Sequence, residues 1–286
     1  MRAAHIALFV IASRENAGLR RSVVGLAVSS AIGVGLLVGA AFLDGVGQEA
    51  LWGVAILIDW GGPAVFGVAG WQLVPAHFAE RNNLVIILAL GESIVALGIG
   101  ADLTLTAGVI TAAVLGVALA SALWWTYFDV VALVTARRLT LATQGRQRNA
   151  LARDSYSYLH FPMVAGIVLA AVGLKETLGD VDDPLEAVEA FALLGGVAFY
   201  LLAHVALRLR NARTINVQRL VLAVGLLAAI PLATTIPALA TLAAVNVLLW
   251  VMISYETFRV YDDRRFRLRH GLEVDVPGPL GGERAT

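Results

Sequence analysis

Long apolar stretches follow one another along most of this chain, and each has roughly the length that crosses a lipid bilayer. A membrane-spanning helix needs roughly 20 predominantly apolar residues. Because every backbone polar group must be satisfied within the bilayer, such stretches fold as helices. We therefore expect an all-α, polytopic transmembrane helix bundle. Its full spans are predicted at about eight places: residues 22–43, 51–74, 83–100, 107–134, 156–178, 188–209, 217–234 and 236–258.

The two ends of the chain differ from this pattern. The first apolar run, residues 3–12, is too short to cross a bilayer, and we expect a partial N-terminal helix there. No small-residue cleavage pattern follows before Arg14, which argues against a signal peptide. We divide the chain into a transmembrane helical domain, residues 1–261, and a cytoplasmic, partly disordered basic tail, residues 262–286.

The composition also favours a bilayer environment. Only 15% of the residues are charged, against about 25% in a typical soluble domain, and 59% are hydrophobic. The formal net charge is +0, which argues against a nucleic-acid partner and leaves the lipid bilayer as the expected one. The chain has no cysteine, so a thiolate metal site is excluded.

Basic and acidic residues alternate between successive connections. The connection after residue 134 carries Arg137 and Arg138, whereas the next one carries Asp180, Asp182 and Asp183. By the positive-inside rule, the basic side faces the cytoplasm. This pattern predicts a multi-pass protein of the plasma membrane with its C-terminus in the cytoplasm.

Glu92 lies in the middle of the span predicted at residues 83–100, next to Ser93. A carboxylate at this depth is costly and usually marks a functional site. His77, Glu80 and Arg81 share a helical face at the inner mouth of the same helix. Arg81 and Glu92 are close to three turns apart, so both could line one polar path. Alternatively, Arg81 reaches the membrane surface and a neutral Glu92 bonds a neighbouring helix.

Asp59 lies near the centre of the preceding span, four residues before Pro63. Proline has no N–H, so the carbonyl of residue 59 loses its helical partner. A carboxylate beside a freed carbonyl is the way in which interrupted helices build cation sites in transporters. The alternative is a packing kink in which a neighbouring hydroxyl satisfies Asp59. Asp59 and Glu92 are expected at similar depth, so they could face each other.

A second polar cluster is predicted near the inner ends of later spans. Asp129 ends an aromatic run, residues 124–128, of the kind that forms an interfacial belt. His160 and His204 lie about one turn inside their spans, at matched depth. They could hydrogen-bond each other, pair with Asp129, or ligate a metal or haem, although no local spacing marks a metal site. Pro162 should kink its helix.

Three motifs, in order along the chain, resemble a known family. The bacterial low temperature requirement protein A family has similar signatures at His77-Phe-Ala-Glu80-Arg81 with Leu90-Gly91-Glu92-Ser93, at Trp124–Asp129, and at Tyr158–Gly166. Family members are generally longer at the N-terminus, which agrees with the short first helix. The resemblance implies an integral membrane protein of the bacterial inner membrane, in a family named for growth in the cold. It implies no particular reaction or substrate.

These features together predict a transporter or channel-like protein that moves a small cation or a proton. Its path is expected to contain Asp59, Glu92, Ser93, Glu80, Arg81 and Asp129, with His77, His160 and His204 as a second polar cluster. No phosphate loop, nucleophile elbow or zinc-protease motif is present, so we expect no enzyme, metal site or cofactor. Two alternatives stay open: a non-transporting structural or sensory protein, and a histidine-based binder of a cofactor or metal.

Overall fold

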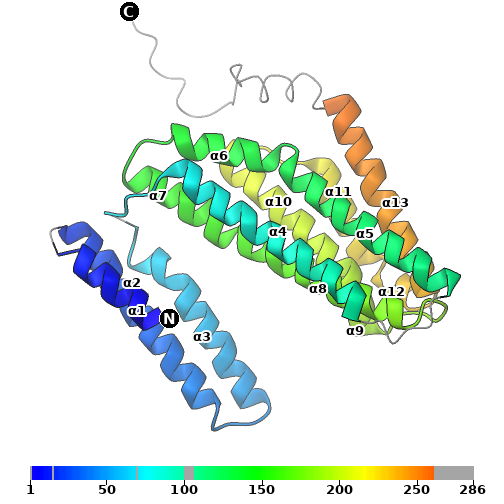
Figure 1. The fold of residues 1–286 in the computed structure, drawn as a ribbon, viewed down its shortest axis with the longest axis horizontal. Coiled ribbons are helices and arrows are strands. Elements are labelled where there is room, and N and C mark those ends of the chain that lie inside the picture. The colour runs from blue at the N-terminus through cyan, green and yellow to red at the C-terminus, as the bar shows by residue number, and fades with distance from the viewer. Residues whose placement is uncertain (1, 15, 69, 100–105, 261–286) are drawn as a thin grey trace, which may run out of the picture. The chain divides into compact units, whose positions relative to one another are not determined.

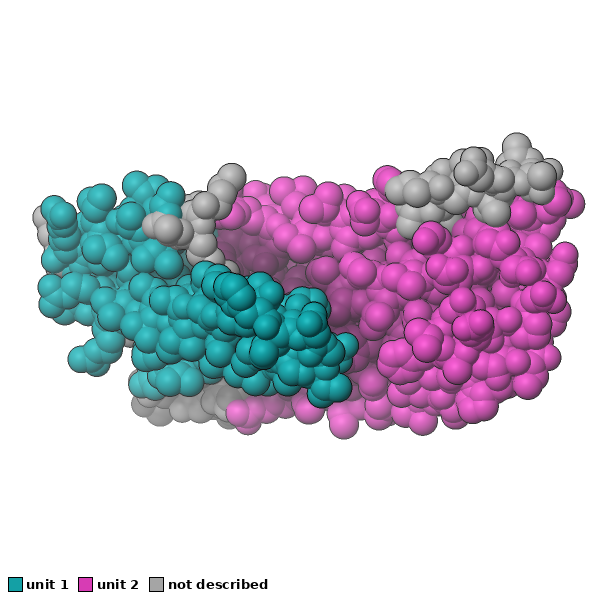
Figure 2. Space-filling model, turned by 90° about the horizontal axis from the view of Figure 1, so that it is seen from below, with its two compact units in different colours: residues 1–75, 139–154 teal, residues 76–138, 155–286 magenta. Residues whose placement is uncertain are grey.

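The computed structural model describes residues 2–14, 16–68, 70–99 and 106–260, and no strand occurs in these ranges. The all-α prediction is therefore confirmed. The predicted tail, residues 262–286, lies outside the described residues. The chain forms two compact units: unit 1 is residues 1–75 with 139–154, and unit 2 is residues 76–138 with 155–286 (Figure 2). Each unit is described by itself.

Unit 1 is organised around a helical hairpin. Its helices are α1 (Arg2–Ala12), α2 (Ala17–Ala40), α3 (Val46–Val65) and α7 (Arg146–Ala152). The short helix α1 corresponds to the partial N-terminal helix expected at residues 3–12. Helix α2 begins at Asn16, whose side chain caps it by accepting a hydrogen bond from the backbone N–H of Leu19 at 3.0 Å. Figure 1 shows α2 and α3 side by side, with the chain reversing between them.

Small residues bring α2 and α3 into close contact. Gly25, Ser29 and Gly33 are spaced by four, and all three are buried. A Cβ added at Gly25 would lie 2.3 Å from Phe66, and one added at Gly62 would lie 2.5 Å from Oγ of Ser29. In lipid, such small residues allow helix backbones to approach each other. This stripe therefore fixes the hairpin of unit 1.

Unit 2 holds the main apolar core. Its helices are α4 (Pro75–Ile99), α5 (Ala107–Phe128), α6 (Val131–Leu141), α8 (His160–Gly179), α9 (Ala187–Ala190), α10 (Gly196–Ala212), α11 (Val217–Ala228), α12 (Ile230–Ala233) and α13 (Ala238–Tyr255). Three π-helical segments interrupt them: η1 (Arg153–Tyr158), η2 (Phe191–Gly195) and η3 (Glu256–Val260). Helix α10 packs against α8 and α11, and α13 packs against α5.

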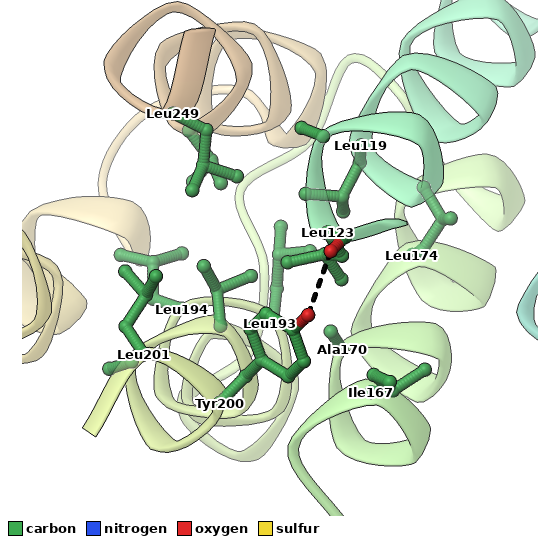
Figure 3. Packing of buried hydrophobic residues seen from close by; sticks show 14 of the residues in the cluster. Leu119, Leu123, Ile167, Ala170, Leu174, Leu193, Leu194, Tyr200, Leu201 and Leu249 are labelled. Atoms are coloured by element: carbon green, nitrogen blue, oxygen red, sulfur yellow. Dashed lines mark hydrogen bonds between the residues drawn. The ribbon is translucent and has the colours of Figure 1, made fainter. Parts of the chain in front are cut away.

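The close packing of α8 against η2 and α10 depends on glycine. A Cβ added at Gly173 would lie 2.4 Å from the backbone nitrogen of Leu193, and one at Gly196 would lie 2.4 Å from that of Ala170. Leucines from α5, α8, η2 and α13 fill the space around these contacts (Figure 3). Within this core the hydroxyl of Tyr200 donates a hydrogen bond to the carbonyl of Leu123 at 2.7 Å. The core thus contains a polar side chain, Tyr200, that is satisfied by a backbone carbonyl of a neighbouring helix.

The prediction of eight full spans is not confirmed. Among the described residues, five helices are long and apolar enough to cross a membrane: Ala17–Ala40, Ala107–Leu141, Arg146–Gly179, Ala187–Ala212 and Ala238–Phe258. Helix α11 is shorter than the span predicted at residues 217–234, because it ends at Ala228 and Pro231 stands at the start of α12. Helix α3 also ends before its predicted limit, at Val65 instead of residue 74. The hydropathy pattern located these apolar segments but overestimated the length of their helices.

Candidate functional site

Ionisable side chains from separate helices meet inside unit 2. They are Tyr127 of α5, His160 of α8, His204 of α10, Arg219 of α11 and Glu256 at the start of η3. All are buried: His204 is 2% exposed, Glu256 5% and Arg219 6%. Buried charges are rarely tolerated unless they are paired and hydrogen-bonded. We call these five residues the polar network, and their contacts show how each is accommodated.

Arg219 and Glu256 form a two-pronged ion pair. Nη2 of Arg219 lies 2.8 Å from Oε2 of Glu256, and its Nε lies 3.1 Å from Oε1. Asn216 also donates to Oε1, at 2.7 Å. The same Asn216 caps α11 by accepting from the backbone N–H of Arg219, so the start of the helix positions both partners. Both carboxylate oxygens are therefore satisfied in an apolar setting.

Arg219 of the ion pair also contacts His204. Nη1 of Arg219 hydrogen-bonds Nδ1 of His204. A guanidinium group only donates hydrogen bonds, so Nδ1 must accept and the imidazole hydrogen must sit on Nε2. Nε2 is buried and has no hydrogen-bond partner among the described residues. In this arrangement His204 is a neutral imidazole with a buried N–H that lacks an acceptor.

Tyr127 lies between the two histidines. Its ring centroid is 5.5 Å from that of His160 and 6.1 Å from that of His204. Its hydroxyl lies 2.6 Å from Nε2 of His160 and 2.7 Å from Oδ1 of Asn83 on α4. Nδ1 of His160 in turn lies 2.7 Å from the carbonyl oxygen of Ser155. The polar network thus consists of two hydrogen-bonded parts, Glu256–Arg219–His204 and Tyr127–His160. The rings of His204 and Tyr127 bring the two parts side by side without a hydrogen bond between them among the described residues.

The π-helical segment η1 positions His160. Pro162 was expected to kink the helix, but it lies in the first turn of α8, and the irregular backbone is the π-helical segment that precedes it. Ser155 of η1 offers its carbonyl to His160 and its hydroxyl to Oδ1 of Asn211 at 2.9 Å. The ring of Tyr156 stacks on that of His160 at 4.9 Å. Local π-helical segments often occur at functional sites.

A pocket opens beside the ion pair. It has an empty volume of about 240 Å³, which includes space open to the outside, and it is lined by Trp125, Thr126, Asp129, Val130, Arg219, Ile253, Glu256 and Thr257. Asp129, predicted from its place after the aromatic run, therefore shares this pocket with the ion pair. Two carboxylates and one guanidinium give the lining a formal charge of −1 when all are ionised.

The other predicted acids lie elsewhere. In unit 1, Oδ1 of the half-buried Asp59 accepts a hydrogen bond from Oγ of Ser30 at 3.0 Å. This is the contact expected if a neighbouring hydroxyl satisfies Asp59. In unit 2, Glu92 is exposed, whereas Ser93 is buried and bonds the carbonyl of Leu90 at 2.6 Å. Because Asp59 and Glu92 belong to different units, their predicted approach is not established.

The charged cluster at the start of α4 lies outside the core. His77, Glu80 and Arg81 are all exposed. His160 and His204 are instead buried and joined through Tyr127, although no direct hydrogen bond between them occurs in the described residues. Of the predicted site residues, the structure brings together Asp129, His160 and His204.

Sequence reasoning missed several members of the site. They are Arg219, Glu256, Asn83 and Asn216, and sequence patterns mark Arg219 only as one basic residue in a connection expected on the cytoplasmic side. Glu256 carries a usable signal, since it is an acid at the end of an apolar helix in a span predicted to continue to residue 258. Its partner, however, is 37 residues earlier in the chain, and nothing in the local sequence links the two.

The geometry does not favour a histidine-ligated metal or haem. No group of three or more His, Cys, Asp or Glu side chains suited to a metal ion occurs within the described residues. Both ring nitrogens of His160 are engaged, by Ser155 and Tyr127. His204 presents Nδ1 to the Arg219 cation, which disfavours a second cation at that atom.

The described part of the chain is helical, and several of its helices are long enough to cross a bilayer. It also buries ionisable groups inside a helix bundle. These features define a multi-pass integral membrane protein. Residues 1–254 match the model of the family described as bacterial low temperature requirement A protein (LtrA), and the chain belongs to this family. The match confirms the resemblance found in the three motifs. No curated protein and no solved structure matches the chain.

Proposed function

We propose that this protein is a transporter or channel-like protein that moves protons or a small cation through unit 2. The observation that carries the proposal is the polar network, which reaches from the pocket at Asp129 and Glu256 to His160 through hydrogen bonds and one ring contact, between His204 and Tyr127. Ionisable groups inside membrane bundles are costly, and they commonly mark proton relays and ion paths. The carboxylates of the pocket would attract the cation, and the network would carry charge further into unit 2.

Unsatisfied polar atoms near the network support this proposal. Three buried polar groups have no hydrogen-bond partner among the described residues: Nε2 of His204, Nδ2 of Asn211 and the hydroxyl of Tyr156. Buried polar groups of this kind usually bond internal water molecules. Water beside histidine and tyrosine side chains would extend the hydrogen-bonded chain along which protons can move. We therefore expect this part of unit 2 to be hydrated.

Glu92, Ser93, Glu80 and Arg81 of unit 2 remain proposed as further polar residues of the path. Asp59 remains a candidate polar residue within unit 1, where Ser30 donates a hydrogen bond to its carboxylate. The positive-inside pattern favours insertion in the bacterial inner membrane with the C-terminus in the cytoplasm. In that orientation the basic residues near Arg219 would lie on the cytoplasmic side. We propose no enzymatic reaction.

Flux through reconstituted protein tests this proposal. The full chain is placed in liposomes, and proton movement is followed with a pH-sensitive dye while monovalent cations are varied. We expect Glu256→Gln to reduce flux about tenfold or more, because losing its charge-assisted contact with Arg219, about 1.5–3 kcal/mol, changes a barrier by at least about that factor. Asp129→Asn should also reduce flux, because it removes a carboxylate from the pocket lining. Asp59→Asn and Glu92→Gln test the remaining candidate residues in the same assay.

The matched control is Glu176→Gln. Glu176 also forms an ion pair, with Lys175 at 3.8 Å, but its side chain is 40% exposed and lies outside the polar network. Its substitution should leave flux unchanged. Absence of flux in the unsubstituted protein would refute transport and favour the structural or sensory alternative. In that case the two-pronged Arg219–Glu256 pair would serve only to hold α11 and η3 together.

A further inference from the structure

The hydroxyl of Tyr127 lies between two groups that cannot both receive its hydrogen. The carbonyl of Ser155 can only accept, so the Nδ1 atom that faces it must carry the imidazole hydrogen of His160. In a neutral imidazole Nε2 is then a bare acceptor, 2.6 Å from the Tyr127 hydroxyl. Oδ1 of Asn83 is also an acceptor, 2.7 Å from the same hydroxyl. A hydroxyl carries one hydrogen, so Tyr127 cannot donate to both acceptors at once.

Two arrangements of the hydrogens give each of these contacts one donor and one acceptor. In the first, a proton is added to Nε2 of His160, which donates to the oxygen of Tyr127, and Tyr127 donates to Oδ1 of Asn83. In the second, the proton is absent: Tyr127 donates to Nε2 of His160, and the amide of Asn83 turns over so that Nδ2 donates to Tyr127. The two arrangements differ by one proton on Nε2 of His160 and by a half-turn of the Asn83 side-chain amide. A half-turn of the amide exchanges Oδ1 and Nδ2 at the position next to the hydroxyl, so the placement of Asn83 suits either arrangement.

We propose that Asn83, Tyr127 and His160 form a proton-binding site, in which a proton taken up on Nε2 of His160 reverses both hydrogen bonds of the Tyr127 hydroxyl. The proton arrives from water, forms one N–H bond and leaves to water, and the imidazole changes between neutral and singly positive. The role of this site in transport rests on the proposed function. The site adds to that function by identifying the ion bound in the polar network as a proton.

Asn83 is suited to this exchange. It is half-buried, and its Nδ2 makes no other hydrogen bond among the described residues, so turning the amide breaks no second contact. Asparagine offers an acceptor and a donor at the two ends of one small group. An apolar residue could support neither arrangement, and a carboxylate that stays ionised could support only the first.

The surroundings of the site explain why His160, and not His204, receives the proton. On η1 the ring of Tyr156 stacks on His160, and α4 contributes the uncharged Asn83. On α10 the groups that face Tyr127 are His204 and, beside it, Tyr200. The accepting nitrogen of His204 is occupied by Arg219 of α11, whose charge is balanced by Glu256 of η3.

Nitrogen-15 spectroscopy of the histidines tests the proposal directly. The full chain, labelled at histidine and held in lipid nanodiscs, is recorded over a series of pH values, with His160→Gln assigning the His160 signals. We expect Nδ1 of His160 to carry hydrogen throughout and Nε2 to gain hydrogen in a growing share of molecules as the pH falls. His204 should keep its single hydrogen on Nε2. A His160 that lacks hydrogen on Nδ1, or that never gains a second one while folded, overturns the proposal.

A coupled pair of substitutions separates this site from general packing. At a fixed pH, Asn83→Leu should lower the ratio of Nε2-protonated to neutral His160 by about 2- to 10-fold. In the protonated arrangement it leaves the Tyr127 O–H without an acceptor, which costs more than the unfilled oxygen lone pair that it leaves in the neutral arrangement. In a Tyr127→Phe background the same substitution should have no effect, because the link between Asn83 and His160 is gone. Equal effects in both backgrounds contradict the proposal. If a variant does not fold, the spectra of the unsubstituted protein still decide.

This experiment does not depend on flux. If His160 binds the proton as described but liposomes show no transport, the site stands and the proposed function fails. If liposomes show proton flux but His160 never takes a second proton, the site is refuted while transport stands.

Discussion

At the residue scale, the buried ion pair between Arg219 and Glu256 is expected to have a large effect on stability. Both side chains are almost completely buried, and their two hydrogen bonds are joined by that of Asn216. Burying a charged pair costs solvation free energy, which the attraction between the partners offsets only when the geometry is good. Removing one partner therefore leaves a buried, uncompensated charge. This asymmetry gives the pair a clear signature in stability measurements.

We expect Glu256→Leu to lower the free energy of unfolding by about 3–5 kcal/mol, because the buried charge of Arg219 loses its ion-pair partner. The double variant Arg219→Leu with Glu256→Leu should recover most of this loss, since both charges are then gone. The measurement is a denaturant titration in mixed micelles. Glu176→Leu, at the exposed pair with Lys175, should change stability by less than about 0.5 kcal/mol. A double variant as unstable as the single one would contradict this account.

At the scale of the elements, glycines determine how closely helices approach. The backbone of Gly173 on α8 meets that of Leu193 on η2 so closely that an added Cβ would lie 2.4 Å from a backbone nitrogen. Backbone atoms cannot move aside as a flexible side chain can. In contrast, an added Cβ at Gly225 of α11 meets nothing within 4 Å. The same residue type therefore has opposite roles in two helices of unit 2.

Alanine substitutions should separate these roles. Gly173→Ala is expected to destabilise unit 2 by about 1–3 kcal/mol, because the helices must move apart to admit the methyl group. Gly225→Ala should be neutral or stabilising by up to about 1 kcal/mol, because alanine favours the helix more than glycine does. Thermal unfolding of the two variants in the same detergent compares them. Equal effects of the two substitutions would count against the packing argument.

At the scale of the whole molecule, the chain combines two compact units with several membrane helices. The arrangement of charged residues between these helices predicts which connections face the cytoplasm. The exposed Thr143 lies in a basic connection, whereas the exposed Asp182 lies in an acidic one. The two connections flank one long helix, Arg146–Gly179, so they should lie on opposite sides of the membrane.

Thiol labelling tests this orientation without background, because the chain contains no cysteine. We expect Asp182→Cys to react in intact cells with a maleimide that cannot cross the inner membrane. Thr143→Cys should react only after the cells are opened. Labelling of both positions from outside, or the reverse pattern, would show that the positive-inside interpretation is wrong. Opened cells provide the control that each thiol is accessible.

The sequence by itself determined the class of the protein and part of its packing. Apolar stretches of membrane length require helices, because only helices satisfy their backbone groups without water or neighbouring strands. The four-residue spacing of Gly25, Ser29 and Gly33 is typical of a helix-packing stripe, and all three are buried in the hairpin of unit 1. Ala31, Gly35 and Gly39 have the same spacing, yet a Cβ added at Gly35 meets nothing within 4 Å. Periodicity shows which residues share a face, but not which face meets another helix.

Only the tertiary structure decided which polar residues meet. Sequence analysis selected Asp129, His160 and His204 by their type and depth, and these three do gather in or beside the polar network. It gave Glu92 the central role, yet Glu92 is exposed and the buried acid is Glu256. Hydropathy registers how deep a charge lies along its own helix. Whether that charge is paired depends on side chains from other helices, and the partner Arg219 is brought to Glu256 only when α11 and α13 pack together.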